Sequence, residues 1–464
     1  MAQPRFLLLT YPVQGHINPG MQFAKRLIQI GAEVTYLTAN SAYRRMTTNC
    51  STNFPNELSF SPFSDGYDEG FKHGDNVDHY TSELARRGSL ALSELIDSGL
   101  NEGRPFTCLV YSMLLPWAAL VANKFHLPSA MLAVQPAAVL SSYYYYIHGY
   151  GDIIKEKFRV EDDSSFIGFP GLPFLTIRDL SSILSPSNSY DSYLELFKEQ
   201  FEIVEKGNKP RVLVNTFDEL EGEALRAIGQ LNLIGIGPLI PSAFLGEKDS
   251  FDSSFRADLL PSSKNYIEWL NLKPKGSVVY VSFGSFSGLS KPQTEELAKG
   301  LLGFGRPFLW VMREKENVAE DEKLSCREEL EKLGMIVPWC AQADILSNSS
   351  LACFVTHCGW NSSLESLASG VPLVVFPQRS DQFTNAKMIA DVWKTGVRVK
   401  ANKDGVPEGE EVKRCLELVT GEGEKGTEIR RNAEKWKILS REAAKEGGSS
   451  DRNFKAFVDE IVNG

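Results

Sequence analysis

Short apolar runs alternate with segments of helical periodicity along most of this 464-residue chain. In the amino-terminal half, strands are expected at Arg5–Tyr11, Glu33–Thr38, Cys108–Tyr111 and Ser129–Val134, with helices at 79–97 and 116–125 between them. Strands that are apolar on both faces and separated by helices are typical of parallel sheets covered on both sides. The alternation therefore predicts an α/β protein with a doubly wound parallel sheet.

The pattern loosens between Pro238 and Lys264, a stretch rich in Pro, Ser and charged residues, and then starts again. Further strands are expected at 277–283, 308–312, 335–338, 353–356 and 373–376, with a helix over 291–303. We therefore expect two Rossmann-like domains, 1–240 and 265–440, joined by a linker over 241–264. A helical segment, 441–464, is expected to pack back on the first domain. Ligands of such sheets bind at the carboxyl ends of the strands, so two sheets facing each other would form a cleft for a small molecule.

Charge and cysteine content restrict the partners. The net charge of −10 makes nucleic acid and anionic membranes poor partners, and no apolar stretch is long enough to cross a bilayer. Seven cysteines form no C-x-x-C pair, which favours reduced thiols over disulfides or a metal site. The amino terminus lacks a basic leader and a small-residue cleavage site. We expect a cytoplasmic monomer without metal.

The most informative segment is WCAQADILSNSSLACFVTHCGWNSSLESLASGVPLVVFPQRSDQ, residues 339–382. Its centre is a strand that ends at His357, a turn containing glycine, and a helix that is expected to begin near Asn361. A helix amino terminus offers free N–H groups and about half a positive charge, so His357, Asn361 and Ser362 could converge on a phosphate. Taken singly, His357 could be a turn residue, and Ser362 with Glu365 could form a capping box.

The whole segment resembles the carboxy-terminal signature box of plant family-1 UDP-dependent glycosyltransferases, without a gap from Trp339 to Gln382. The resemblance implies a GT-B fold, two Rossmann-like domains facing across a cleft, with UDP-glucose bound by the second domain. It implies that Trp339 stacks on uracil and that Gln342 and Glu365 hold the ribose. His357, Asn361 and Ser362 would hold the diphosphate. The other donor-binding residues that it implies are Cys340, Trp360, Asp381 and Gln382, with Ser285 on the phosphate side and Gln135 near the sugar.

A second feature is the sequence Pro12–His16, directly after the first strand. Asn18 is expected to cap the following helix and Pro19 to occupy its first position, which leaves His16 in a loop. The resemblance makes His16 the catalytic base that takes a proton from the acceptor, a task suited to imidazole. It also implies an acceptor pocket that contains Gln14, Gly15, Ile17 and Phe376.

Ser112 stands where the family usually has an aspartate that orients the histidine. A serine cannot offset the charge of an imidazolium, so we expect a weaker base. Either another carboxylate replaces it, with Asp65 and Asp68 as candidates, or the acceptor is already acidic.

The likeness is greatest to the branch that makes glucose esters and flavonoid or anthocyanin 5- or 7-glucosides, with cues at 10–27, 64–71 and 108–117. It implies inverting, metal-independent glucose transfer without a cofactor, to a phenolic acceptor or alternatively to a carboxylic acid. A non-catalytic nucleotide-sugar-binding protein is a remote alternative. A nicotinamide-dependent enzyme is disfavoured because the only G-x-G-x-x-G, at 421–426, does not join a strand to a helix. No Asp-x-Asp and no P-loop motif occurs.

Overall fold

The computed structural model describes residues 3–49, 54–72, 74–160, 165–186, 191–207, 209–246, 265–284, 288–313, 324–403 and 405–463. The chain forms two compact units. One unit contains the chain up to Ser242 together with Glu442–Gly464, and the other contains most of the residues between them, up to Arg441. Most of the predicted linker, residues 247–264, lies outside the described residues.

The first unit is built on a seven-stranded parallel sheet in the order β3-β2-β1-β4-β5-β6-β7. The strands are β1 (Arg5–Leu9), β2 (Glu33–Ala39), β3 (Leu58–Phe63), β4 (Cys108–Ser112), β5 (Ser129–Ala133), β6 (Val212–Val214) and β7 (Leu233–Gly235). The four predicted strands are confirmed. β3, β6 and β7 were missed, because β3 contains Pro62 and alternating serines and the other two have only three residues each.

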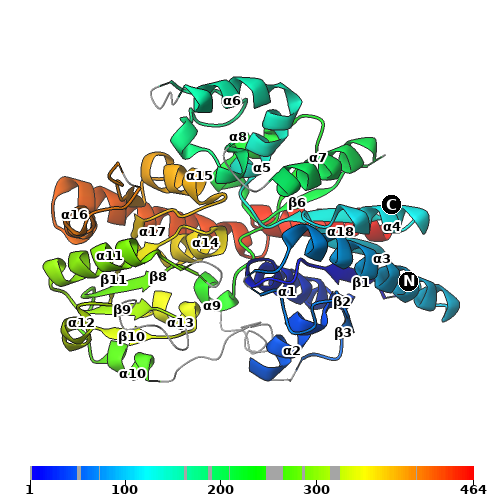
Figure 1. Cartoon of the computed structure of the whole chain (residues 1–464). Helices are drawn as coiled ribbons and strands as arrows, with labels where there is room; N and C mark the ends of the chain where they lie inside the picture. The colour runs from blue at the N-terminus through cyan, green and yellow to red at the C-terminus, as the bar shows by residue number, and fades with distance from the viewer. Residues whose placement is uncertain are drawn as a thin grey trace. The chain divides into compact units, whose positions relative to one another are not determined.

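Helices connect these strands, as Figure 1 shows. They are α1 (Gln14–Gln29), α2 (Asn40–Asn49), α3 (Val77–Asn101), α4 (Pro116–Lys124), α5 (Ala137–Tyr145), α6 (Gly151–Arg159), α7 (Asp191–Lys206) and α8 (Asp218–Ala227). The short helix α9 (Ser242–Leu245) follows β7 and belongs, from Ala243 onward, to the second unit. The carboxy-terminal helix α18 (Ser449–Asn463), red in Figure 1, also belongs to this unit.

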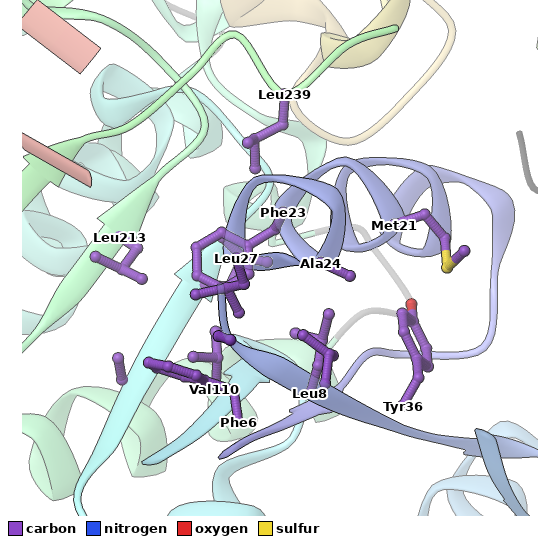
Figure 2. Packing of buried hydrophobic residues seen from close by; sticks show 14 of the residues in the cluster. Phe6, Leu8, Met21, Phe23, Ala24, Leu27, Tyr36, Val110, Leu213 and Leu239 are labelled. Carbon is purple, nitrogen blue, oxygen red and sulfur yellow. The ribbon is translucent and has the colours of Figure 1, made fainter. Parts of the chain in front are cut away.

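Helix α1 packs on the sheet through its apolar face. Phe23, Ala24 and Leu27 lie over Phe6, Leu8 and Val110 of strands β1 and β4 (Figure 2), and all of these side chains are fully buried. Helix α18 adds to the same core, because the ring of Phe454 meets Phe23 edge to face at 5.4 Å. Full burial of a large apolar side chain contributes about 1.5–3 kcal/mol, so both helices are fixed to the sheet.

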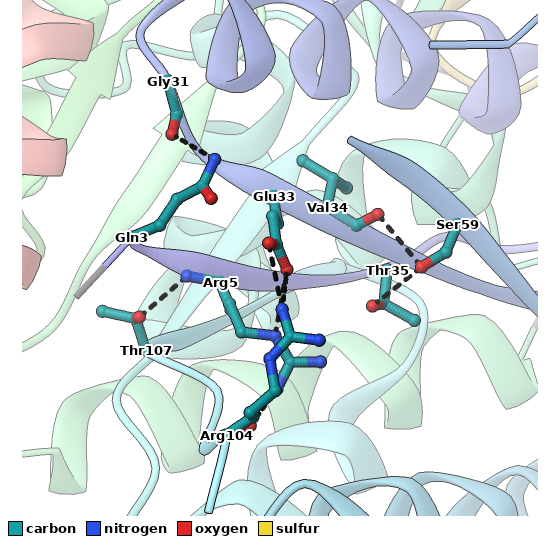
Figure 3. A network of polar contacts seen from close by, with 9 residues as sticks. All are labelled: Gln3, Arg5, Gly31, Glu33, Val34, Thr35, Ser59, Arg104 and Thr107. Atoms are coloured by element: carbon teal, nitrogen blue, oxygen red, sulfur yellow. Dashed lines mark hydrogen bonds and ion pairs between the residues drawn. The ribbon is translucent and has the colours of Figure 1, made fainter. Parts of the chain in front are cut away.

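The amino ends of β1 and β2 carry a partly exposed polar network (Figure 3). Glu33 lies 3.3 Å from Arg5 Nε and 2.7 Å from Arg104 Nη2, and the Gln3 side chain donates to the Gly31 carbonyl at 3.0 Å. Such exposed ion pairs contribute little, about 0–1 kcal/mol each. This edge of the sheet is occupied by structural contacts, so the opposite edge is the place to look for a ligand site.

Helix α1 begins earlier than the sequence predicted. Its first residue is Gln14, and the N–H groups of His16 and Ile17 both donate to the Val13 carbonyl at 3.0 Å. Pro19 therefore lies inside the helix. Proline lacks the N–H that would bond to the Gly15 carbonyl, so the helix loses one hydrogen bond. The two N–H groups that the Val13 carbonyl accepts still close the first turn. His16 is a first-turn residue and not a loop residue.

The second unit is built on a six-stranded parallel sheet in the order β10-β9-β8-β11-β12-β13. The strands are β8 (Val278–Ser282), β9 (Phe308–Val311), β10 (Met335–Val337), β11 (Leu351–Thr356), β12 (Leu373–Val375) and β13 (Gly396–Arg398). The helices are α10 (Tyr266–Asn271), α11 (Lys291–Phe304), α12 (Arg327–Leu333), α13 (Gln342–Leu346), α14 (Trp360–Ser369), α15 (Gln382–Lys387), α16 (Gly409–Thr420) and α17 (Glu424–Ala444). All five predicted strands are confirmed, and β13 was missed.

Each sheet has a point where the direction of winding reverses. In the first sheet the chain moves outward from β1 to β2 and β3, and then returns to place β4 on the other side of β1. In the second sheet the same reversal falls between β8 and β11. Ligands of open α/β sheets bind at the carboxyl ends of the strands at such switch points. The topology thus selects the segments after β1 and β4, and those after β8 and β11, as the places for a site.

Candidate active site

The switch point of the first sheet brings together His16 and Ser112. His16 lies in the first turn of α1, after β1, and Ser112 is the last residue of β4. The imidazole Nδ1 is 3.1 Å from Ser112 Oγ, and this oxygen also accepts the N–H of Tyr11 at 3.2 Å. Ser112 has no exposed surface, whereas His16 is partly buried. Burial lowers the pKa of His16 to about 4, so the imidazole is neutral near pH 7.

The two carboxylates that could have replaced the missing aspartate have other partners. Asp65 accepts the N–H of Tyr67 at 2.9 Å, and Asp68 accepts from the side chains of Asn40 and Ser64 at 3.2 and 3.1 Å. Among the described residues, the His16 imidazole is hydrogen-bonded to Ser112 and to neither of these carboxylates. The expectation that Asp65 or Asp68 partners His16 is therefore corrected.

A group of aromatic side chains adjoins His16. The Tyr11 ring lies 5.7 Å from the imidazole and meets Tyr80 edge to face at 6.3 Å. Tyr67 and Phe71 each lie 5.0 Å from Tyr80, and Phe71 keeps 39% of its surface exposed. The exposed part of this aromatic surface comes from Phe71 and partly from Tyr67, because Tyr11 and Tyr80 are buried, and the Tyr80 ring stands nearly perpendicular to those of Tyr11 and Tyr67. Sequence reasoning missed them, although Tyr67 and Phe71 belong to the segment 64–71 that supported the family resemblance.

Two of the four residues predicted for an acceptor pocket are core residues. Ile17 has no exposed surface and packs with the first core, and Phe376 is 4% exposed and meets Phe283 edge to face at 5.4 Å. Packing uses the surface of both side chains, and their role in an acceptor pocket stays a prediction. Gly15 is exposed, and the amide of Gln14 donates to Asn18 Oδ1 at 2.6 Å, so these two remain beside His16.

In the second unit, a tight turn joins β11 to α14. Cys358 adopts a left-handed conformation with φ of 54°, which is costly for a residue with a Cβ atom. Two side chains hold it there: Thr356 Oγ1 accepts the N–H of Cys358 at 3.1 Å, and Asn385 Nδ2 donates to its carbonyl at 2.9 Å. Gly359 precedes the helix and provides no side-chain cap. The amino terminus of α14 is thus presented at the switch point in the manner of an anion site.

The His357 imidazole lies beside this helix terminus, packed directly against two glycines. A Cβ atom added to Gly284, whose φ is +78°, would lie 2.8 Å from the imidazole, and one added to Gly359 would lie 2.6 Å from Nε2. The imidazole is bonded to the backbone of Ser282, and burial lowers its pKa to about 4. Within the described residues the buried Nδ1 has no hydrogen-bond partner. The ring is rigidly placed, neutral, and has one polar atom available to a ligand.

Gln342, Ser362 and Glu365 form one hydrogen-bonded cluster. The Gln342 amide donates to Ser362 Oγ at 2.9 Å and to Glu365 Oε2 at 2.6 Å. Ser362 is the third residue of α14 and does not cap it, so the alternative that Ser362 and Glu365 form a capping box is wrong. Sequence reasoning missed Tyr280 of β8, whose hydroxyl donates to Gln342 Oε1 at 3.1 Å and lies 3.5 Å from Cys340 Sγ. Only the sheet brings Tyr280 to this cluster, so no local signal could have found it.

Trp339 is partly buried, and its buried indole N–H has no partner among the described residues. The same holds for the side-chain oxygen of Gln135, which follows β5 in the first unit. These atoms are unusual, because buried polar groups are nearly always hydrogen-bonded. Each is able to receive a ligand.

Asp381 and Gln382 are held by their own loop. Asn385 Nδ2 donates to Asp381 Oδ2 at 2.8 Å, and burial raises the pKa of Asp381. The side-chain oxygen of Gln382 accepts the N–H groups of Gln378 and Arg379 at 2.8 and 3.1 Å. The Trp360 indole is only 4% exposed and lies 6.0 Å from the ring of Trp393. Ser285 lies outside the described residues.

Comparison with known proteins identifies the family. The family described as "UDP-glucoronosyl and UDP-glucosyl transferase" matches residues 251–409. The chain is 58% identical to phloretin 4'-O-glucosyltransferase of Malus domestica over 99% of this chain and 98% of that protein. The chain belongs to this family. It is a UDP-glycosyltransferase. It is also 55% identical to crocetin glucosyltransferase, chloroplastic, of Gardenia jasminoides, over 100% of this chain and 98% of that protein.

Solved structures agree with the family. The UDP-glycosyltransferase superimposes on Os79 from O. sativa in complex with UDP with a TM-score of 0.86, at 32% identity, covering 98% of this chain and 100% of that chain. The fold is GT-B, as the resemblance predicted. Within the described part of the UDP-glycosyltransferase, no cluster of His, Cys, Asp and Glu could hold a metal ion, and no helix combines the length and apolar character needed to cross a membrane.

Proposed function

We propose that this UDP-glycosyltransferase transfers glucose from UDP-glucose to a small acceptor, with inversion at the anomeric carbon and without a metal ion. The first domain, residues 1–240, binds the acceptor, and the second, residues 265–440, binds the donor. The observation that carries the proposal is the turn after β11, where a clamped His357 and the uncapped terminus of α14 lie beside the Gln342–Glu365 cluster.

The diphosphate is assigned to the terminus of α14. The helix supplies about half a positive charge and backbone N–H groups, and Asn361 and Ser362 add polar side chains. His357 contributes a hydrogen bond through Nδ1 as an imidazolium, which takes up a proton when the anion binds, because the other ring nitrogen already donates to the Ser282 backbone. As the bond to UDP breaks, these fixed groups stabilise the developing charge without rearrangement.

The remaining donor contacts are assigned around this anion site. Glu365, already hydrogen-bonded to Gln342, accepts the ribose hydroxyls, and Trp339 stacks on uracil; its indole N–H has no partner among the described residues. The glucose is assigned to Trp360, Asp381 and Gln382, and the role of Gln135 near the sugar stays a prediction from the family resemblance. Cys340 contributes its backbone groups to donor binding, because its thiol is buried against Tyr280.

The acceptor is assigned to the aromatic surface beside His16. Relatives named for phloretin and for anthocyanidin 3-O-glucoside, the latter 49% identical over 100% of this chain and 100% of that protein, support a phenolic acceptor. The serine beside His16 supports the second candidate, a carboxylic acid that needs no base. Six of the seven cysteines are described and free, which supports a reducing compartment, and we propose the cytoplasm.

One experiment tests the proposal. Purified protein is incubated with UDP-glucose and a panel of phenols and carboxylic acids, with UDP release and product mass as readouts. Hydroxylamine added afterwards cleaves esters and leaves ethers intact, so it separates the two candidate products. UDP-glucose binding without UDP release from any acceptor would favour the non-catalytic alternative. Absence of UDP binding by calorimetry would refute the donor site.

A further inference from the structure

The hydroxyl hydrogen of Ser112 has one available acceptor. Within the described part of the chain, Ser112 Oγ makes two hydrogen bonds, to the Tyr11 N–H and to His16 Nδ1. A backbone N–H can only donate, so Tyr11 uses a lone pair of the oxygen. Ser112 has no exposed surface, so bulk water does not reach its hydroxyl. The hydroxyl is satisfied only if it donates to Nδ1 of His16.

This direction of donation fixes the tautomer of His16. In a neutral imidazole one nitrogen donates and the other accepts. If Nδ1 accepts from Ser112, then Nε2 carries the hydrogen and is a donor. An aspartate at position 112 would impose the opposite arrangement, because a carboxylate can only accept; Nε2 would then have the lone pair that a base requires.

Resting on the function proposed above, we propose that Ser112 holds His16 with its hydrogen on Nε2, so that His16 binds a carboxylate acceptor and the product is a glucose ester. An Nε2–H group is a hydrogen-bond donor that suits an ionised oxygen. A phenol or alcohol must instead lose a proton, and this tautomer has no free lone pair to take it.

The reaction balances without a base. A carboxylate oxygen forms the bond to C1 of glucose, and the bond between C1 and the phosphate oxygen breaks with its electron pair leaving on UDP. The negative charge of the acceptor is transferred to the released UDP, and no proton moves. A carboxylic acid, with a pKa of about 4, is ionised at pH 7, whereas about one phenol molecule in a thousand is.

The surroundings of His16 keep it neutral. Its pKa is lowered by burial, and no charged side chain of the described chain contributes. The neighbouring titratable groups are Tyr11 and, beyond it, Tyr80, Tyr193 and Asp65. Burial raises the pKa of Tyr11 and of Tyr80 well above its ordinary value, so both stay protonated. The charge of Asp65 acts on these two tyrosines and not on His16.

The test compares Ser112→Asp and Ser112→Ala with the unaltered protein, using cinnamic acid and 4-vinylphenol, which share one skeleton. For the unaltered protein we expect kcat/KM for the acid to be constant between pH 7 and 9 and that for the phenol to rise about tenfold per pH unit, following its ionisation. Ser112→Asp should raise phenol kcat/KM at pH 7 on the order of 10²-fold and flatten its pH profile, since a base is restored. It should lower kcat/KM for the acid. Ser112→Ala should reduce the preference for the acid severalfold.

Two-bond 15N–1H NMR spectra of the six histidines, with His16→Gln for assignment, report the tautomer directly and without activity. A hydrogen on Nδ1 of His16 would overturn the inference. So would a change in kcat/KM by the same factor for the acid and the phenol in both Ser112→Asp and Ser112→Ala. Thermal unfolding shows whether Ser112→Asp is folded; if it is not, Ser112→Ala and the NMR spectra decide. UDP release with the phenol alone would overturn this inference and leave the proposed function intact. Failure of calorimetry to detect UDP binding would end the proposed function itself.

Discussion

Replacing Gly284 with alanine tests whether the placement of His357 determines donor affinity. The substitution has two costs. A residue with a Cβ atom at φ of +78° costs about 1–2 kcal/mol, and the new methyl group would lie 2.8 Å from the imidazole, an overpacking that costs about 1–3 kcal/mol more. His357 must move by several tenths of an ångström to relieve it.

The chain offers a matched control in the same unit. Gly276 also has a positive φ, +65°, but a Cβ atom there would have no neighbour within 4 Å. Gly276→Ala therefore carries the backbone cost without the collision. A hydrogen bond to a charged group contributes about 1.5–3 kcal/mol, so displacing His357 should weaken UDP binding roughly 10- to 150-fold in Gly284→Ala and leave it nearly unchanged in Gly276→Ala.

Isothermal titration calorimetry with UDP provides the measurement, and urea unfolding of both variants provides the stability comparison. Unchanged UDP affinity in both variants would refute the argument, because it would mean that the imidazole contributes nothing to diphosphate binding. Equal loss of affinity in both would mean that backbone strain, and not the position of His357, controls the site.

Three further predictions follow from the same structure. Glu365→Ala should raise the KM for UDP-glucose roughly 10- to 100-fold, because a charged hydrogen-bond partner of the ribose is lost, and should leave the acceptor KM nearly unchanged; an unchanged donor KM in steady-state kinetics would place the ribose elsewhere. Phe454→Ala should destabilise the first unit by about 3–5 kcal/mol, because the ring is 1% exposed in the core. As a control, Ile438→Ala, at a side chain 54% exposed, should cost under 0.5 kcal/mol. Equal losses of unfolding free energy in urea for the two variants would contradict the packing of α18. Stability should also fall as the pH drops from about 6.5 to about 4, because burial lowers the pKa of both His16 and His357 to about 4 while the unfolded chain binds protons from about 6.5. Replacing both histidines with asparagine should weaken this pH dependence in thermal unfolding, and an unchanged dependence would assign it to other groups.

Local sequence patterns were sufficient for most of the secondary structure. Apolar, β-branched runs predicted nine strands because each run makes its own extended segment favourable, whatever its neighbours in the sheet. They missed β3, which contains proline, and the three-residue strands β6, β7 and β13, although they found β10 and β12 of the same length. They also misplaced the start of α1, because the preference of Asn18 and Pro19 for a helix start yielded to the turn that Val13 makes directly after β1.

The residues around Trp339–Gln382 are contiguous, so sequence alone could propose a donor site. It could not show that Gly284 lies against His357, or that Tyr280 reaches Gln342, since these contacts cross between strands. It likewise could not decide which group partners His16.

The sequence by itself determined the two parallel sheets and the positions of His16, Ser112 and the donor segment, because periodicity and motif spacing are properties of neighbouring residues. Tertiary structure decided the rest. Pairing of β1 with β4 brings Ser112 against an imidazole 96 positions away, and burial at that point leaves the serine hydroxyl one acceptor among the described residues. The direction of a hydrogen bond depends on every group around it in space, so it can be settled only once the chain has folded.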